Sequence, residues 1–194
     1  MRLLIVVRIV HTPFDMGSAR DGLVSGAIEK MGQESWEENQ RMIERFWREL
    51  ECEIDQLELD CSRVRVYQDG LPCGGEVGEK IVRKTAEMGS SNYRIVQKLI
   101  ERGCVLEATE SPELLMTEYD HIKATIDAKT EDERADAHRR YDSIKDNLLK
   151  RRDAFIAQRI DSSLQEGETG VLFIGALHDV VSALPDDVEL KMLD

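Results

Sequence analysis

The chain begins with a short apolar run that can be buried on both of its faces. Every residue from Leu3 to Val10 is apolar except Arg8. An unbroken run of β-branched residues is typical of a central strand in a parallel sheet, because helices cover both faces of such a sheet. The run is shorter than the roughly 18 apolar residues that a membrane span requires. We therefore expect residues 3–10 to form the first strand of an α/β protein.

Helical and strand-like patterns alternate after this run. We expect a loop at residues 11–32, a helix at about 34–60, a strand at 63–67, helices at about 76–88 and 91–103, a strand at 104–108 and a strand at 171–174. The tail at 188–192 can add an edge strand. Such alternation predicts a mostly parallel sheet of about four or five strands, joined by right-handed crossovers and flanked by helices.

A long helical region precedes the last main strand. Ser111 is a helix cap, Pro112 stands at the first helical position and Glu113 places an acid in the first turn. A second cap at Thr130 divides the region. We interpret residues 111–165 as a helical insertion within a single α/β domain spanning residues 1–194. The region lacks sustained heptads, so a long coiled coil is not expected, but its helices offer a surface for homo-oligomers.

Charge and cysteine content narrow the class of partner. The formal net charge of −13 argues against binding to nucleic acid or to an anionic membrane through a basic surface. The four cysteines show no C-x-x-C spacing and do not resemble a secreted disulfide framework. The apolar N-terminus is broken by Arg8 and lacks a signal-peptide cleavage site. We expect a cytoplasmic protein whose ligand is a small molecule or a peptide.

Candidate functional residues follow the strands. His11 comes after the first strand and Asp69 after the second. Glu107 and Glu110 stand at or just beyond the end of the third, and His178 follows the last main strand. Parallel sheets bind ligands in the crevice at the carboxyl ends of their strands. We expect these side chains to gather there, although a shift of one residue decides whether Glu107 or Glu110 faces the site.

Two of the four histidines belong to this set, and imidazole suits either of two chemistries. With Glu110 or Asp69, His11 and His178 can hold a divalent ion such as Mn, Co or Zn with a position open for water. A metal-free pair, with one histidine as base and the other facing a developing negative charge, fits equally well. In the structural alternative, His11 caps a strand end and His178 opens a helix.

Two flanking features bear on the same edge. Gly175 allows the backbone to turn sharply off a buried strand, which gives the G-x-x-H spacing ending at His178 its meaning. Arg151, Arg152 and Asp153 lie in a helix whose neighbouring apolar residues point inward, so one of the three can reach the strand ends. The alternative is an ordinary ion pair on a helix surface.

The segment from Arg151 to Ala157, followed by Phe173 to His178, resembles the C-terminal signature of the TraB/ChaN/Tiki/erythromycin-esterase-like superfamily. Those proteins carry an Arg-Asp or Arg-Asn helix before a strand that ends in G-x-x-H, and an N-terminal strand that ends in histidine. The resemblance implies an α/β fold with a histidine- and glutamate-lined site and, for some members, a hydrolytic activity that can depend on metal. Carried over, it favours His11, Glu110 (or Glu107), Arg152 and His178.

Three functional hypotheses remain open from the sequence. The first is a hydrolase-like enzyme that acts on a small molecule or peptide, with metal assistance as an option. The second is a non-catalytic domain that binds a small ligand or senses it. The third is an oligomeric interaction protein built on the helices between residues 111 and 165.

Overall fold

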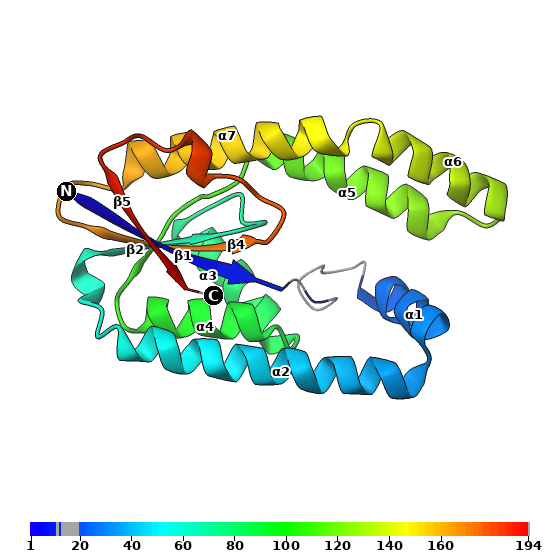
Figure 1. Cartoon of the computed structure of the whole chain (residues 1–194), viewed down its shortest axis with the longest axis horizontal. Coiled ribbons are helices and arrows are strands. Elements are labelled where there is room, and N and C mark those ends of the chain that lie inside the picture. The colour runs from blue at the N-terminus through cyan, green and yellow to red at the C-terminus, as the bar shows by residue number, and fades with distance from the viewer. Residues whose placement is uncertain (11, 13–19, 194) are drawn as a thin grey trace.

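The computed structural model describes residues 1–10, 12 and 20–193, and in these residues five parallel strands form one sheet (Figure 1). The strands are β1 (Arg2–Ile9), β2 (Val64–Gln68), β3 (Val105–Leu106), β4 (Thr169–Gly175) and β5 (Val188–Leu193). Their order across the sheet is β3-β2-β4-β1-β5, and every neighbouring pair is parallel. The expected α/β class and parallel sheet are confirmed, and the C-terminal tail is an edge strand.

Helices cover one face of the sheet through α2 (Gln33–Gln56), α3 (Gly75–Glu87) and α4 (Ser91–Glu101). Strand residues alternate between faces, so Ile5 and Val7 of β1 point to this side. They pack with Trp47, Leu50 and Val96 from the helices in the larger of two buried apolar clusters. This cluster joins the first two crossovers of the chain to the sheet.

The opposite face is covered by α7 (Lys145–Ser163) and by the 3-10 helix η3 (Val181–Ala183). Leu4 and Val6 of β1 point here and pack against Ile156 and Ile160 of α7. All four side chains are fully buried. The sheet is therefore the middle of three layers.

The remaining helices extend beyond the carboxyl edge of the sheet. α5 (Pro112–Asp127) and α6 (Glu131–Asp142) run with the first half of α7 as an arm past the strand ends (Figure 1). Ser111 and Thr130 cap α5 and α6, and Glu133 completes a capping box with Thr130, so both expected helix starts are confirmed. Among the described residues, no helix combines the length and the apolar character that crossing a membrane requires.

Three local expectations were wrong. The expected loop at residues 11–32 contains α1 (Arg20–Met31), whose Gly22 lies against Ile126 of α5. The sequence favours Ser91 or Asn92 as the cap of the helix expected at 91–103, but the cap of α4 is Ser90, which accepts a hydrogen bond from Tyr93 N–H. β3 has only two residues, although five were expected.

Gly78 of α3 offers a test of how tightly the segment after β2 is packed. A Cβ atom at Gly78 would meet the carbonyl oxygen of Cys73 at 2.3 Å, whereas a Cβ at Gly26 of α1 would meet nothing within 4 Å. Gly78→Ala should lower the free energy of unfolding by about 1–3 kcal/mol, because backbone must move. Gly26→Ala should raise it by up to about 1 kcal/mol, because alanine favours a helix interior. Urea unfolding of both variants measures these changes in the free energy of unfolding. Equal changes in the two variants would contradict the close packing at Gly78.

Candidate functional site

The site lies where two neighbouring strands send the chain to opposite faces of the sheet. After β2 the chain enters α3 on one face, and after β4 it enters η3, which packs against α7 on the other. Because β2 and β4 are hydrogen-bonded neighbours, the divergence opens a crevice between their carboxyl ends. Asp69 follows the end of β2, and His178 follows the end of β4.

Asp69 is held in place by a tight turn and by β4. Leu71 N–H donates to the Gln68 carbonyl at 3.1 Å, and Gly70 takes a φ of 78°, which glycine adopts without strain. The Asp69 carboxylate then accepts a hydrogen bond at 3.0 Å from the backbone N–H of Gly175. The end of β2 is thereby fastened to the end of β4.

Glu110 arrives from the segment between β3 and α5. Its own N–H and that of Thr109 both donate to the Leu71 carbonyl at 3.0 Å. The same segment touches Gly74, where a Cβ atom would stand 2.6 Å from the carbonyl oxygen of Leu106. Close backbone contact thus fixes the position of Glu110 relative to Asp69, and the Glu110 side chain is fully buried.

Arg152 connects these acids to the helical arm. It lies one turn before Ile156 on the buried stripe of α7, which places its side chain at the strand ends. Its Nη2 donates to Asp69 at 2.8 Å, its Nε donates to Glu110 at 3.1 Å and its Nη1 donates to Glu118 of α5 at 2.5 Å. Each nitrogen of the guanidinium therefore already donates a hydrogen bond to a carboxylate.

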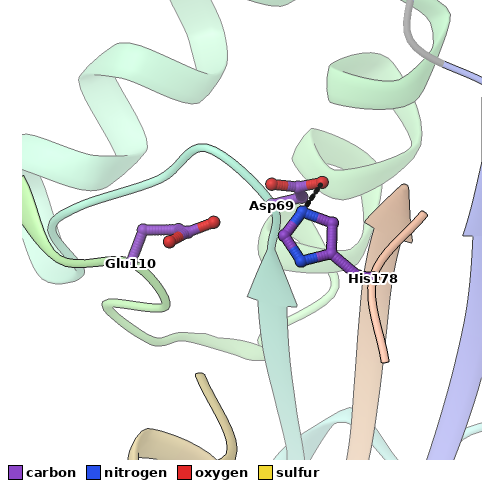
Figure 2. A group of neighbouring side chains, drawn as sticks. All are labelled: Asp69, Glu110 and His178. Atoms are coloured by element: carbon purple, nitrogen blue, oxygen red, sulfur yellow. Dashed lines mark ion pairs between the residues drawn. The ribbon is translucent and has the colours of Figure 1, made fainter. Parts of the chain in front are cut away.

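His178 stands on the other side of Asp69, after the turn that ends β4 (Figure 2). Its backbone N–H donates to the Gly175 carbonyl at 3.1 Å, and Arg8 of β1 donates to its carbonyl at 2.8 Å. The ring Nδ1 lies 2.5 Å from Asp153 Oδ1, and Nε2 lies 3.5 Å from Asp69 Oδ2. A carboxylate can only accept, so Nδ1 donates to Asp153 and Nε2 is left available to take a proton.

Negative charge exceeds positive charge in this cluster. Asp69, Glu110 and Glu118 supply three carboxylates around the guanidinium of Arg152, and Asp153 adds a fourth beside His178. Burial raises the pKa of Glu110 to about 7; the nearby Asp69 carboxylate adds to the shift, and Arg152 opposes it. The carboxylates in turn raise the pKa of Arg152 although burial opposes this, so its positive charge is permanent. Even with a proton on Glu110 and on His178, three carboxylates would face two cations.

A pocket of about 580 Å³ opens beside the cluster. Asp69, Glu118, Arg152 and His178 line its polar end. Its other walls are largely apolar and come mainly from α5, α7 and the turn after β4: Leu115, Met116, Tyr119, Ile122, Leu149 and Leu177. The volume is in the range of small-molecule sites, which combine apolar walls with a few convergent polar groups. Glu110 lies behind Arg152 and does not line the pocket.

Asp69, Glu110 and His178 form a group with metal-ligand chemistry, since one ligand atom from each lies within 4.8 Å of the others (Figure 2). The guanidinium of Arg152, however, donates from the same Nη2 to both acids of this group. A cation shared by Asp69 and Glu110 would have to displace that guanidinium. The arrangement therefore does not fit a metal held between these two carboxylates, and we derive no chemical step through one.

Most of the expected site residues lie close together in the structure. The structure brings Asp69, Glu110, Arg152, Gly175 and His178 together at the carboxyl edge of the sheet. Their functional roles remain predictions.

Glu107 is the expected residue that does not join them. Its carboxylate pairs with Arg65 of β2 and lies 3.8 Å from Arg159 of α7. The backbone after β3 directs the Glu107 side chain toward Arg65 and Arg159, and the Glu110 side chain toward Arg152. Of the two glutamates, Glu110 therefore faces the site. His11, expected as catalytic group and metal ligand, lies outside the described residues.

Two members of the cluster were not singled out from the sequence. Asp153 was considered only as one of three neighbouring residues, and the structure shows that both Arg152 and Asp153 reach the site, on two sides of Asp69. Glu118 was missed. Its signal was the spacing along α5, where Leu115, Glu118 and Ile122 share one helical face.

No family model matches the chain, and neither the curated proteins nor the solved structures contain a match to it. The resemblance to the TraB/ChaN/Tiki/erythromycin-esterase-like superfamily therefore stays a prediction.

The raised pKa of Glu110 predicts a dependence of stability on pH. Between the ordinary value of 4.5 and about 7, the folded chain holds a proton that the unfolded chain releases. The contribution of Glu110 to the free energy of unfolding is therefore complete below about pH 4.5 and is lost as pH rises through about 7. Relative to Glu110→Gln, which does not titrate, the wild-type chain should lose on the order of 2 kcal/mol between pH 5 and pH 8.

Urea unfolding at a series of pH values measures this difference. Glu113→Gln, which changes an exposed acid of α5, is the matched control and should show no such trend. A stability difference between the wild type and Glu110→Gln that does not fall between pH 5 and pH 8 would show that Glu110 is already ionised in the folded chain over this range.

Proposed function

We propose that the chain is a hydrolase-like enzyme that acts on a small molecule, with His178 as its general base. The observation that carries the proposal is the pair of contacts made by the His178 ring. Asp153 lies 2.5 Å from Nδ1, Nε2 lies 3.5 Å from Asp69, and both His178 and Asp69 line the pocket. A buried histidine oriented by a carboxylate and open to a pocket on its second nitrogen is the arrangement that general-base catalysis needs.

The proposed reaction uses water as the nucleophile. Nε2 of His178 takes a proton from a water molecule while the water oxygen bonds to the carbonyl carbon of an ester or amide. The imidazolium that forms lies between the carboxylates of Asp153 and Asp69, which stabilise its charge. When the bond to the leaving group breaks, the imidazolium returns the proton to that group, and the site is restored.

Arg152 has a positioning role in this proposal. Its guanidinium holds Asp69 at 2.8 Å and Glu118 at 2.5 Å, so it fixes the acids of the pocket wall relative to His178. The resemblance to the TraB/ChaN/Tiki/erythromycin-esterase-like superfamily favours His11, Glu110 (or Glu107), Arg152 and His178 and points to hydrolysis. The apolar walls favour a substrate with an apolar body, which small molecules supply more readily than charged peptides.

A panel of 4-nitrophenyl esters of alkanoic acids tests the proposal in the presence of a chelator. The wild-type chain should hydrolyse at least one ester above the rate of buffer. His178→Ala should lower kcat/KM by about 100-fold or more. Asp153→Asn should lower kcat by a similar factor, because the amide oxygen would accept from Asp179 N–H and the amide NH2, a donor, would face Nδ1 and favour the wrong ring tautomer.

His138→Ala is the matched control, since His138 is exposed on α6, and its rate should equal that of the wild type. Hydrolysis that survives His178→Ala in a folded variant would reject His178 as the base. Activity that the chelator abolishes would instead support metal-assisted hydrolysis. Ligand binding without turnover of any ester would leave the alternative, a binding or sensor domain.

A further inference from the structure

The polar end of the pocket consists of hydrogen-bond acceptors. The carboxylates of Asp69 and Glu118 line it, together with Nε2 of His178, which accepts when Nδ1 donates to Asp153. Arg152, whose guanidinium also lines this end, donates to a carboxylate from each of its three nitrogens. A ligand that enters the pocket therefore meets acceptors in excess.

Gln68 adds an acceptor that has no partner. Its side chain is fully buried and lines the pocket. Its Nε2 donates to the backbone carbonyl of Asp69 at 3.0 Å, which fixes the orientation of the amide. The opposite atom, Oε1, has no hydrogen-bond partner among the described residues. An unpaired buried acceptor is destabilising, so a donor brought by a ligand is favoured at this place.

The charge of the surroundings points the same way. Carboxylates outnumber cations in the cluster even when Glu110 and His178 both carry a proton. The chain as a whole has a net charge of −13. A carboxylate or phosphate on the ligand would meet repulsion, and Arg152 already donates to carboxylates, whereas an ammonium group would meet attraction and acceptors.

We infer that the pocket takes a small cationic amphiphile: a molecule with an ammonium group at the end lined by Gln68, Asp69 and Glu118 and an apolar body against the α5 and α7 walls. The inference rests on the proposed function only where it names a substrate for hydrolysis. As a statement of ligand class, it stands on the acceptors, the charge and the apolar walls. For the enzyme, it names the substrate class as amine-bearing esters or amides.

Binding of three probes with the same alkyl chain tests the ligand class on the wild-type protein. n-Octylamine, 1-octanol and octanoate are titrated at pH 7.5 by isothermal titration calorimetry. Octylamine should bind at least about tenfold more tightly than octanol, and octanoate should bind most weakly. Added salt should weaken octylamine and leave octanol unchanged. Equal affinities for amine and alcohol, or tightest binding of octanoate, would overturn the inference.

Two lysine variants separate the pocket from the acidic surface of the protein. Ala176 is exposed and lines the pocket, and Ala124 is exposed on α5 away from it. Ala176→Lys places an ammonium at the pocket and should weaken octylamine by about tenfold, whereas Ala124→Lys changes net charge equally and should stay within about twofold. Equal weakening by both variants would show that the amine binds the surface, and the inference would fail.

The outcomes also separate this inference from the proposed enzyme. Selective octylamine binding without hydrolysis of any ester would keep the ligand class and reject the hydrolase. Hydrolysis of alkanoate esters with no preference for amine-bearing probes would keep the hydrolase and reject the ligand class.

Discussion

The guanidinium of Arg152 joins α7 to acidic residues that precede it by 34 to 83 positions in the sequence. It belongs to α7, and it donates to Asp69 after β2, to Glu110 after β3 and to Glu118 in α5. Burying four carboxylates and a guanidinium costs hydration energy, and this cost is offset only while the groups remain paired. Removing one partner of a buried ion pair typically costs about 3–5 kcal/mol. The position of each acid in the pocket wall therefore depends on this one side chain.

The strand register explains why the cluster forms where it does. The central strands β1, β2 and β4 are buried on both faces, so a slip by one residue would exchange the two apolar clusters and move Asp69 away from Gly175. The opposite exits of β2 and β4 then leave room for a ligand between their ends. α5 and α7 close that space from the side of the arm, and their apolar faces form most of the pocket wall. Self-association through these helices stays a prediction.

The sequence predicted the main strands and several residues at their carboxyl ends, because buried strands and helix caps have strong local sequence patterns. The run after Met1, the cap at Ser111 and the turn at Gly175 each depend on residues close in sequence. α1 was missed because its two internal glycines disfavour a helix and its apolar residues do not form one face, while contact with Ile126 acts across about a hundred residues. Glu118 was missed for the same reason: its partner, Arg152, is distant in sequence. Asp153 was not singled out for another reason: only its contact with the His178 ring distinguishes it from Arg151 and Arg152.

The tautomer of His178 tests the central claim most directly, because general-base chemistry at the pocket requires Nε2 to accept. A two-bond proton–nitrogen correlation spectrum of ¹⁵N-histidine-labelled protein reports the protonation of both ring nitrogens, and the spectrum of a His178→Gln variant assigns the signal. The account predicts a neutral ring that carries its proton on Nδ1 and none on Nε2. A neutral ring protonated at Nε2 would contradict it, since Nε2 could then take no proton from water.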